Sequence, residues 1–143
     1  MTLKQHLTIT GVAAAALLPF REPAEVLLFS AGSVLIDVDH YLLYVQRTRS
    51  FDIPGMFRYF DALQPVQKTI PYVGLCLFHT VDFFLLVGVL TFFHPILLPL
   101  LAGFLFHFAA DLIDLHRKGV PFIRAYFLLE HAIRRRSEGY PWY

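Results

Sequence analysis

The sequence has only one cysteine, Cys76, and few charged residues. A single cysteine excludes an internal disulfide and a metal site made of several cysteines, so we expect any metal to use histidine and carboxylate ligands. Asp, Glu, Lys and Arg make up 16% of the 143 residues, with a formal net charge of +1. A nucleic-acid-binding protein usually has a concentrated basic face and few long apolar runs, so we expect no nucleic-acid partner.

Apolar residues fill most of the chain instead. They make up 57% of it, and fifteen Phe help to bring the aromatic share to 16%, a composition well above the apolar share of a soluble domain. Four apolar stretches stand out, at residues 7–20, 26–45, 72–93 and 95–115. The last three reach the roughly 20 residues that a membrane-spanning helix needs.

The first stretch, residues 7–20, is open to more than one interpretation. Its 14 residues suit a short, tilted or re-entrant helix as well as a full span. Lys4 and the alanine-rich run after it also resemble a signal peptide, but the run ends in Leu-Leu-Pro-Phe-Arg, without a small-residue cleavage pattern. We therefore predict a helix here, and leave open whether it crosses the membrane.

The polar parts of the chain are a linker at residues 46–70 and the C-terminal tail. Pro121 opens a segment, residues 121–136, in which apolar side chains such as Phe122 and Ile133 alternate with arginines. This pattern is typical of an amphipathic helix on an anionic membrane surface. The sequence thus predicts one all-α integral membrane domain, residues 1–143, with three to four transmembrane helices and a C-terminal amphipathic helix.

The positions of Lys and Arg predict the orientation, because positive residues stay on the cytoplasmic side. If all four segments cross, eleven of the twelve basic residues lie on one side and Arg21 lies alone on the other. If the first segment does not cross, Lys4 joins Arg21. In both cases we expect a multi-pass protein of the inner cell membrane, with the linker (46–71) and the tail in the cytoplasm.

Five of the eleven acidic residues lie inside the apolar segments. They are Asp37, Asp39, Asp82, Asp111 and Asp114, and the histidines His6, His40, His79 and His107 accompany them. A charged side chain at the bilayer centre costs about 2.5–3.5 kcal/mol or more on insertion scales, so such residues usually have partners or a metal. A cluster of this size indicates a common function.

Helical spacing decides which of these side chains share a face, because residues three or four apart are neighbours. The pairs are Asp37 with His40, His79 with Asp82, and His107 with Asp111. Asp114 follows one turn later. Asp39 points elsewhere, either as a ligand to another metal or as a hydrogen-bond partner that orients a ligating imidazole.

The predicted orientation places all of these groups at one depth, in the cytoplasmic half of the spans. Imidazole and carboxylate ligands suit zinc, with manganese or iron as alternatives. We therefore predict a site for one to three divalent ions. A structural hydrogen bond or ion pair is the simpler interpretation for Asp82 or Asp114 taken alone.

These His and Asp residues lie in a series of short motifs along the chain. They are Gln5-His6-Leu7, Ile36-Asp37-Val38-Asp39-His40, Phe78-His79-Thr80, Gly103-Phe104-Leu105-Phe106-His107-Phe108-Ala109-Ala110-Asp111, and Gly119-Val120-Pro121. This series resembles the family of bacterial and archaeal inner-membrane proteins known as membrane-bound metal-dependent hydrolases. That family is distantly similar to zinc-dependent phospholipases C and related nucleases, which are all-helical phosphodiesterases.

The resemblance implies a ligand set, residue by residue. The implied metal ligands are His6, Asp37, Asp39, His40, His79, His107 and Asp111, with Asp39 and Asp111 as the catalytic carboxylates. Ile36 stands where the family has proline, and Gly74 where it has a further histidine. Asp82 and Asp114 lie outside the family pattern and are candidate accessory ligands.

Three functions are compatible with this sequence. The first is a metal-dependent hydrolase of a phosphoester or lipid-linked substrate at the cytoplasmic side of the bilayer, with Arg47, Arg49 and Arg58 neutralising the phosphate. The second is a proton or divalent-cation carrier that uses the same residues as a relay, although the outer half of each span is apolar. The third is a catalytically inactive membrane assembly protein. We expect the hydrolase.

Overall fold

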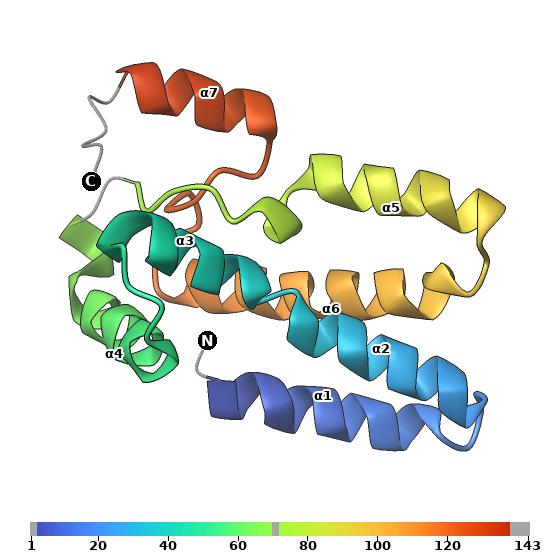
Figure 1. The fold of residues 1–143 in the computed structure, drawn as a ribbon. Helices are drawn as coiled ribbons and strands as arrows, with labels where there is room; N and C mark the ends of the chain where they lie inside the picture. The colour runs from blue at the N-terminus through green and yellow to red at the C-terminus, as the bar shows by residue number, and fades with distance from the viewer. Residues whose placement is uncertain (1–2, 70–71, 138–143) are drawn as a thin grey trace.

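The computed structural model describes residues 3–69 and 72–137, and helices make up most of them (Figure 1). The α-helices are α1 (Leu3–Leu17), α2 (Pro23–Leu35), α3 (Val38–Thr48), α4 (Ile53–Leu63), α5 (Val81–Phe93), α6 (Leu97–Arg117) and α7 (Leu128–Ser137), with 3-10 helices η1 (Gln64–Thr69) and η2 (Leu77–His79). No β-strand occurs in these two ranges, although an isolated bridge joins Gly74 and Arg124. The all-α prediction is confirmed.

Helices α2 and α6 form the centre of the fold, and they cross at glycines. A methyl group added to Gly32 would overlap the backbone carbonyl of Leu100, and one added to Gly103 would overlap the carbonyl of Phe29. Small residues at a crossing let two helix backbones approach closely, as they often do inside membranes. The two glycines therefore set the distance between α2 and α6, and α6 carries His107 and Asp111 of the polar cluster.

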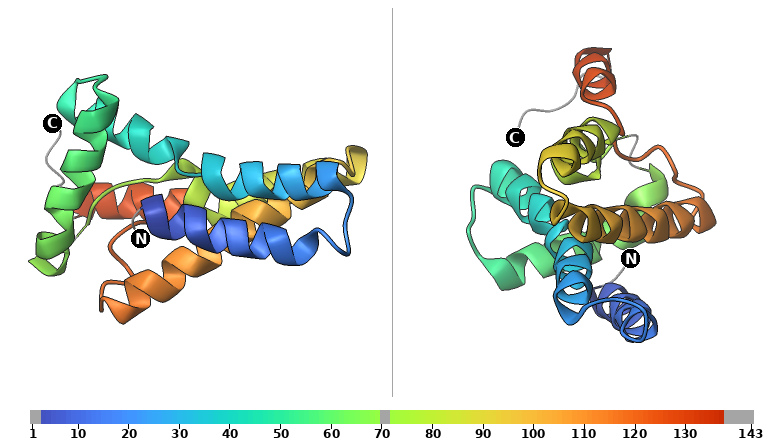
Figure 2. Two further views of the ribbon diagram at one scale, coloured as in Figure 1. Left: turned by 90° about the horizontal axis from the view of Figure 1, so that it is seen from below. Right: turned by 90° about the vertical axis from the view of Figure 1, so that its right-hand side faces the viewer.

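Helices α1 and α5 extend this central pair into two hairpins. Helix α1 packs on α2, and α5 packs on α6. Figures 1 and 2 show both hairpin turns at the same end of the molecule, which we call the hairpin end. Helices α3, α4 and α7 lie toward the opposite end, which we call the cluster end. An apolar core of Ile36, Phe84, Val87 and Phe104 packs between α2, α5 and α6.

Two helical stretches are long and apolar enough to cross a membrane. They are Pro23–Thr48, which contains α2 and α3, and Leu97–Arg117. Large apolar side chains are exposed at the hairpin turns, including Phe20 at 81% and Phe92 at 85%. Exposed apolar surface of this extent is typical of a region that contacts a membrane or another protein.

The third predicted span differs from its expected form, residues 72–93. Its helical part, α5, has 13 residues, and at 1.5 Å per residue it is roughly 20 Å long, less than the roughly 30 Å of a hydrocarbon core. The residues before η2 are extended because they pair with the tail. Val73 N–H donates to the carbonyl of Ile123 (2.7 Å), and after η2 the first residue of α5, Val81, donates its N–H to the carbonyl of Tyr126 (2.9 Å).

The linker and the tail also differ from their predicted forms. Residues 46–70 contain helix α4 as well as turns, and the predicted helix at 121–136 begins only at Leu128. Residues 121–127 are irregular because they fold into the protein: Ile123, Arg124 and Ala125 are buried. This segment therefore belongs to the interior and not to a membrane-surface helix.

Candidate metal centre

Four separate parts of the chain bring the predicted ligands together at the cluster end. His6 comes from α1, and His107 and Asp111 come from α6. Asp37 lies in the break between α2 and α3, Asp39 and His40 lie in the first turn of α3, and η2 supplies His79. His6, Asp39, His79, His107 and Asp111 are buried, whereas Asp37 and His40 are partly exposed. The seven residues implied by the resemblance thus lie around one centre.

The Asp37 carboxylate lies at the middle of this centre. Its Oδ1 atom is 3.3 Å from His107 Nε2, 3.2 Å from His40 Nδ1 and 3.6 Å from His79 Nε2. Metal bonds of about 2.0–2.2 Å place neighbouring ligands roughly 3.0–3.5 Å apart. The spacing around Asp37 is therefore close to that of ligands on a shared ion.

Asp111 forms a second point of convergence. Its Oδ1 atom is 3.2 Å from His6 Nε2, and its Oδ2 atom is 3.7 Å from His79 Nε2. The rings of His6 and His107 stack with their centroids 4.0 Å apart. The imidazoles of His6 and His107 and the carboxylate of Asp111 lie close enough together to bind one ion. An ion beside Asp111 would therefore have at least three donor atoms.

The hydrogen bonds of His107 fix which of its nitrogens can bind a cation. Its Nδ1 lies 2.6 Å from the carbonyl oxygen of Ser33, which can only accept, so Nδ1 carries the proton. The Nε2 lone pair then faces Asp37, and this buried atom has no hydrogen-bond partner. A lone pair facing a carboxylate is stabilised by a proton or a metal ion between the two, so this arrangement fits a metal ion.

His79 repeats the same arrangement. Its Nδ1 lies 2.9 Å from Asp39 Oδ2, and its buried Nε2 has no hydrogen-bond partner. His79 precedes α5 and lies outside both candidate spans. Burial, followed by the nearby charge of Arg124, lowers the pKa of His79 to about 4. The imidazole is therefore neutral near pH 7, with its Nε2 lone pair available to a metal.

Asp39 holds His79 in place. The same Oδ2 atom that accepts from His79 also accepts the backbone N–H of Phe78 at 2.8 Å, and Oδ1 lies 3.0 Å from His40 Nδ1. A carboxylate behind a ligating imidazole fixes its tautomer and orientation. Of the two roles that the sequence leaves open for Asp39, this geometry favours the orienting one.

Three neighbouring groups of donor atoms could hold a metal ion. They are His6, His107 and Asp111; Asp37, His40 and His79; and Asp39, His40 and Cys76. The donor atoms of each group lie within 4.8 Å of one another, and only the second and third groups share a residue, His40. The third group contains Cys76, whose Sγ is 4.0 Å from His40 Nε2. The sequence gives no sign of this role, because a lone cysteine has no spacing pattern that marks it as a ligand.

The other predicted site residues lie away from the three groups. Asp82 accepts the backbone N–H of Leu128 at 2.9 Å, so it holds the start of α7. Asp114 pairs with Lys118 at 2.6 Å, one turn beyond Asp111. Both residues therefore lie outside the three donor groups, although the sequence made them candidate accessory ligands.

The linker arginines also lie elsewhere. Arg47 donates to the carbonyl of Val73, Arg58 pairs with Asp52 at 2.8 Å on the surface, and Arg49 is the exposed residue that ends α3. Neither of the two pockets that adjoin the cluster is lined by any of the three.

Arg124 is the cation that the structure places at the site. It is 5% exposed, and its Nη1 donates to Asp111 Oδ2 at 3.0 Å. Burial opposes its charge and Asp111 favours it, and the pKa of Arg124 is raised overall. The sequence signal for it was weak: one arginine within a run of apolar residues, which the helical pattern assigned to a membrane surface.

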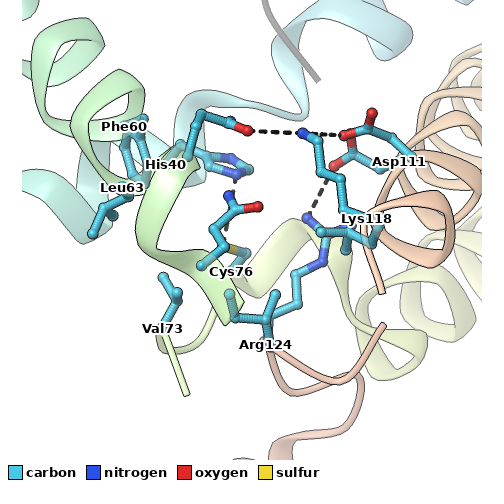
Figure 3. A pocket seen from close by; sticks show the side chains of 13 residues that line it. His40, Phe60, Leu63, Val73, Cys76, Asp111, Lys118 and Arg124 are labelled. Carbon is cyan, nitrogen blue, oxygen red and sulfur yellow. Dashed lines mark hydrogen bonds and ion pairs between the residues drawn. The ribbon is translucent and has the colours of Figure 1, made fainter. Parts of the chain in front are cut away.

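Two pockets open on the cluster. A polar pocket of about 110 Å³ lies between His40, Cys76, Asp111, Lys118 and Arg124. Figure 3 shows the Arg124 and Asp111 side chains meeting on one side of it, with His40 across from them. An apolar pocket of about 380 Å³ lies between α1, α3 and α4. His40 and Asp111 line both pockets.

The family resemblance rests on the sequence motifs alone and stays a prediction. No protein-family model, curated protein or solved structure matches the chain.

Proposed function

We propose that this chain is a membrane-embedded, metal-dependent hydrolase that cleaves a phosphoester. The observation that carries this proposal is the pair of buried Nε2 atoms, on His79 and His107, that face carboxylates without a hydrogen-bond partner. Zinc suits these donors, with manganese or iron as alternatives, and the three neighbouring groups allow one to three ions.

A divalent ion would supply a Lewis acid that polarises a phosphoryl oxygen and makes a water molecule more acidic. The chain's own residues would do the rest. Asp39 and Ser33 hold the two imidazoles in the required tautomers. Arg124 would stabilise negative charge on the phosphate, the role that the sequence analysis expected of the linker arginines.

Asp37 is the proposed proton acceptor. Its side chain is 31% exposed, against 1% for Asp39 and 7% for Asp111, and it lines the apolar pocket. Water would add its oxygen to phosphorus and lose a proton to Asp37, while the ester oxygen leaves with a proton from solvent. Asp111 is tied to Arg124 and His6, so its role would be to hold rather than to accept protons.

The proposed location is the inner membrane, with the linker and tail in the cytoplasm. The two candidate spans and the exposed apolar side chains support a membrane location. The apolar core of Ile36, Phe84, Val87 and Phe104 offers an ion no ligands on its way toward the hairpin end. This arrangement favours a hydrolase over a carrier.

The test is metal content together with hydrolysis. We expect the protein, purified in a maltoside detergent with zinc or manganese, to retain metal and to cleave bis(p-nitrophenyl) phosphate. His107→Ala should lose bound metal and activity with unchanged helicity, whereas His94→Ala, in the exposed α5–α6 turn, should keep both. A well-folded protein that binds no metal, or that binds metal and cleaves no phosphoester, contradicts the proposal.

A further inference from the structure

The two pockets at the cluster differ sharply in chemistry. The polar pocket contains the cations Lys118 and Arg124 beside the carboxylates of Asp111 and Asp114, whereas the apolar pocket is lined mainly by aliphatic and aromatic side chains of α3 and α4. Phe60 and Gln64 join His40 and Asp111 in lining both. A ligand that fills both pockets must therefore have a polar and an apolar part, with the donor cluster at their junction.

The polar pocket is built to take an anion. Arg124 uses Nη1 on Asp111, but its Nε and Nη2 atoms are buried and have no hydrogen-bond partner. Leaving such groups unsatisfied is costly, so their presence indicates an acceptor that binds there. Lys118 Nζ lies at the same pocket, paired with Asp114 and Gln64 (2.8 Å). Asp111 and Asp114 already balance the charges of the two cations, so a phosphate is recognised by its oxygen acceptors, which match the unpartnered donors of Arg124.

The apolar pocket suits an alkyl chain. Its walls include Val34, Val38, Ile53, Met56 and Phe57. Its volume of about 380 Å³ falls within the roughly 300–1,000 Å³ range of ligand pockets. His6 and Asp37 stand at its polar end. A chain lying there would therefore carry its head group to the donor cluster.

From this juxtaposition we propose that the substrate is a phosphorylated amphiphile. Its phosphate lies in the polar pocket against Arg124 and Lys118, and the first carbons of its alkyl chain lie in the apolar pocket between α3 and α4. The inference rests on the proposed function for the fate of the phosphate, but binding of the amphiphile can be measured without hydrolysis.

The first experiment measures how affinity depends on chain length. Inorganic phosphate, butyl phosphate and octyl phosphate are titrated by calorimetry into the metal-loaded protein in lipid nanodiscs. Each buried CH₂ should tighten binding about three- to fourfold, so octyl phosphate should bind on the order of 100-fold more tightly than butyl phosphate. Equal affinities for all three overturn the inference and indicate a site for free phosphate. If octyl glucoside binds as tightly as octyl phosphate, the protein does not recognise the phosphate, and that part of the inference is overturned.

The second experiment separates the two pockets. Met56→Trp should fill the apolar pocket and remove most of the gain from butyl to octyl phosphate. Leu86→Trp, on the exposed face of α5, is the matched control and should keep that gain. If both variants lose it equally, or neither does, the chain is not held by the apolar pocket and the inference fails.

Variants of the cations test the phosphate position. Arg124→Gln should weaken all the alkyl phosphates at least tenfold, and Arg21→Gln, in the exposed α1–α2 turn, should not. Because Arg124 pairs with buried Asp111, this variant could fail to fold. Lys118→Gln then serves as the second variant, since Lys118 is only partly buried. Full retention of binding in a folded cation variant contradicts the phosphate position.

The outcomes distinguish this inference from the proposed function. Hydrolysis of bis(p-nitrophenyl) phosphate without any chain-length dependence of binding leaves the hydrolase standing and overturns the amphiphile. Tight, chain-dependent binding of octyl phosphate without hydrolysis of any phosphoester supports the two-pocket site and overturns the hydrolase.

Discussion

The two ends of the molecule are held together in different ways. Toward the hairpin end, apolar side chains fill the space between α2, α5 and α6, and glycines let α2 and α6 touch. At the cluster end, the carboxylates of Asp37, Asp39 and Asp111 surround a group of imidazoles, with one buried guanidinium among them. The apolar packing is complete without a ligand, whereas the cluster carries excess negative charge. We infer that a cation contributes much of the stability of the cluster end.

Metal removal should have the largest effect on this comparison. Zinc or manganese at 100 times its dissociation constant should stabilise the folded state by about 2.7 kcal/mol, because the metal binds the native cluster and not the unfolded chain. Thermal unfolding with and without a chelator measures the difference. A chelator that leaves the melting temperature unchanged would show that the cluster is stable without a cation.

Asp39→Asn should weaken metal binding by about 10- to 100-fold, because an outer carboxylate that orients a ligating imidazole typically contributes this much. The measurement is a competition titration of zinc against a chelator of known affinity. Asp52→Asn, which changes an exposed carboxylate on the surface, is the matched control. A complete loss of one ion per chain would instead make Asp39 a direct ligand.

Gly103→Ala should destabilise the protein by about 1–3 kcal/mol, because the added methyl group would overlap the backbone of α2. Gly11→Ala is the control: its methyl would meet nothing within 4 Å, so better helix propensity should stabilise the protein by about 0.5–1 kcal/mol. Denaturant unfolding measures both. The Gly103→Ala effect should be the same with and without metal, and a strong dependence on metal would mean that the two ends are coupled.

Arg58→Gln should have the smallest effect. The Arg58–Asp52 pair is exposed, and such pairs contribute about 0–1 kcal/mol. We expect unchanged hydrolysis and a change in unfolding free energy within about 0.5 kcal/mol. A large loss of activity in this variant would indicate that the linker arginines, and not Arg124, neutralise the phosphate.

Much of the cluster could be predicted because charge in an apolar segment is visible in the sequence. His107 and Asp111 share a face of one long helix, and the structure brings them together with His6 and Asp37. Asp82 has the same type of spacing from His79, yet it holds the start of α7. Spacing within a helix predicts neighbours only where the helix exists, and His79 lies in a 3-10 turn before α5 begins.

The sequence by itself determined the all-helical class, the apolar segments and the set of buried His and Asp residues. Periodicity and hydropathy are local properties, so they can be read along the chain. The tertiary structure alone decided that Arg124 and Cys76 join the cluster, that Asp39 stands behind His79, and that two pockets of opposite chemistry meet at Asp111. Those contacts join residues far apart in the sequence, and their geometry depends on how the helices pack.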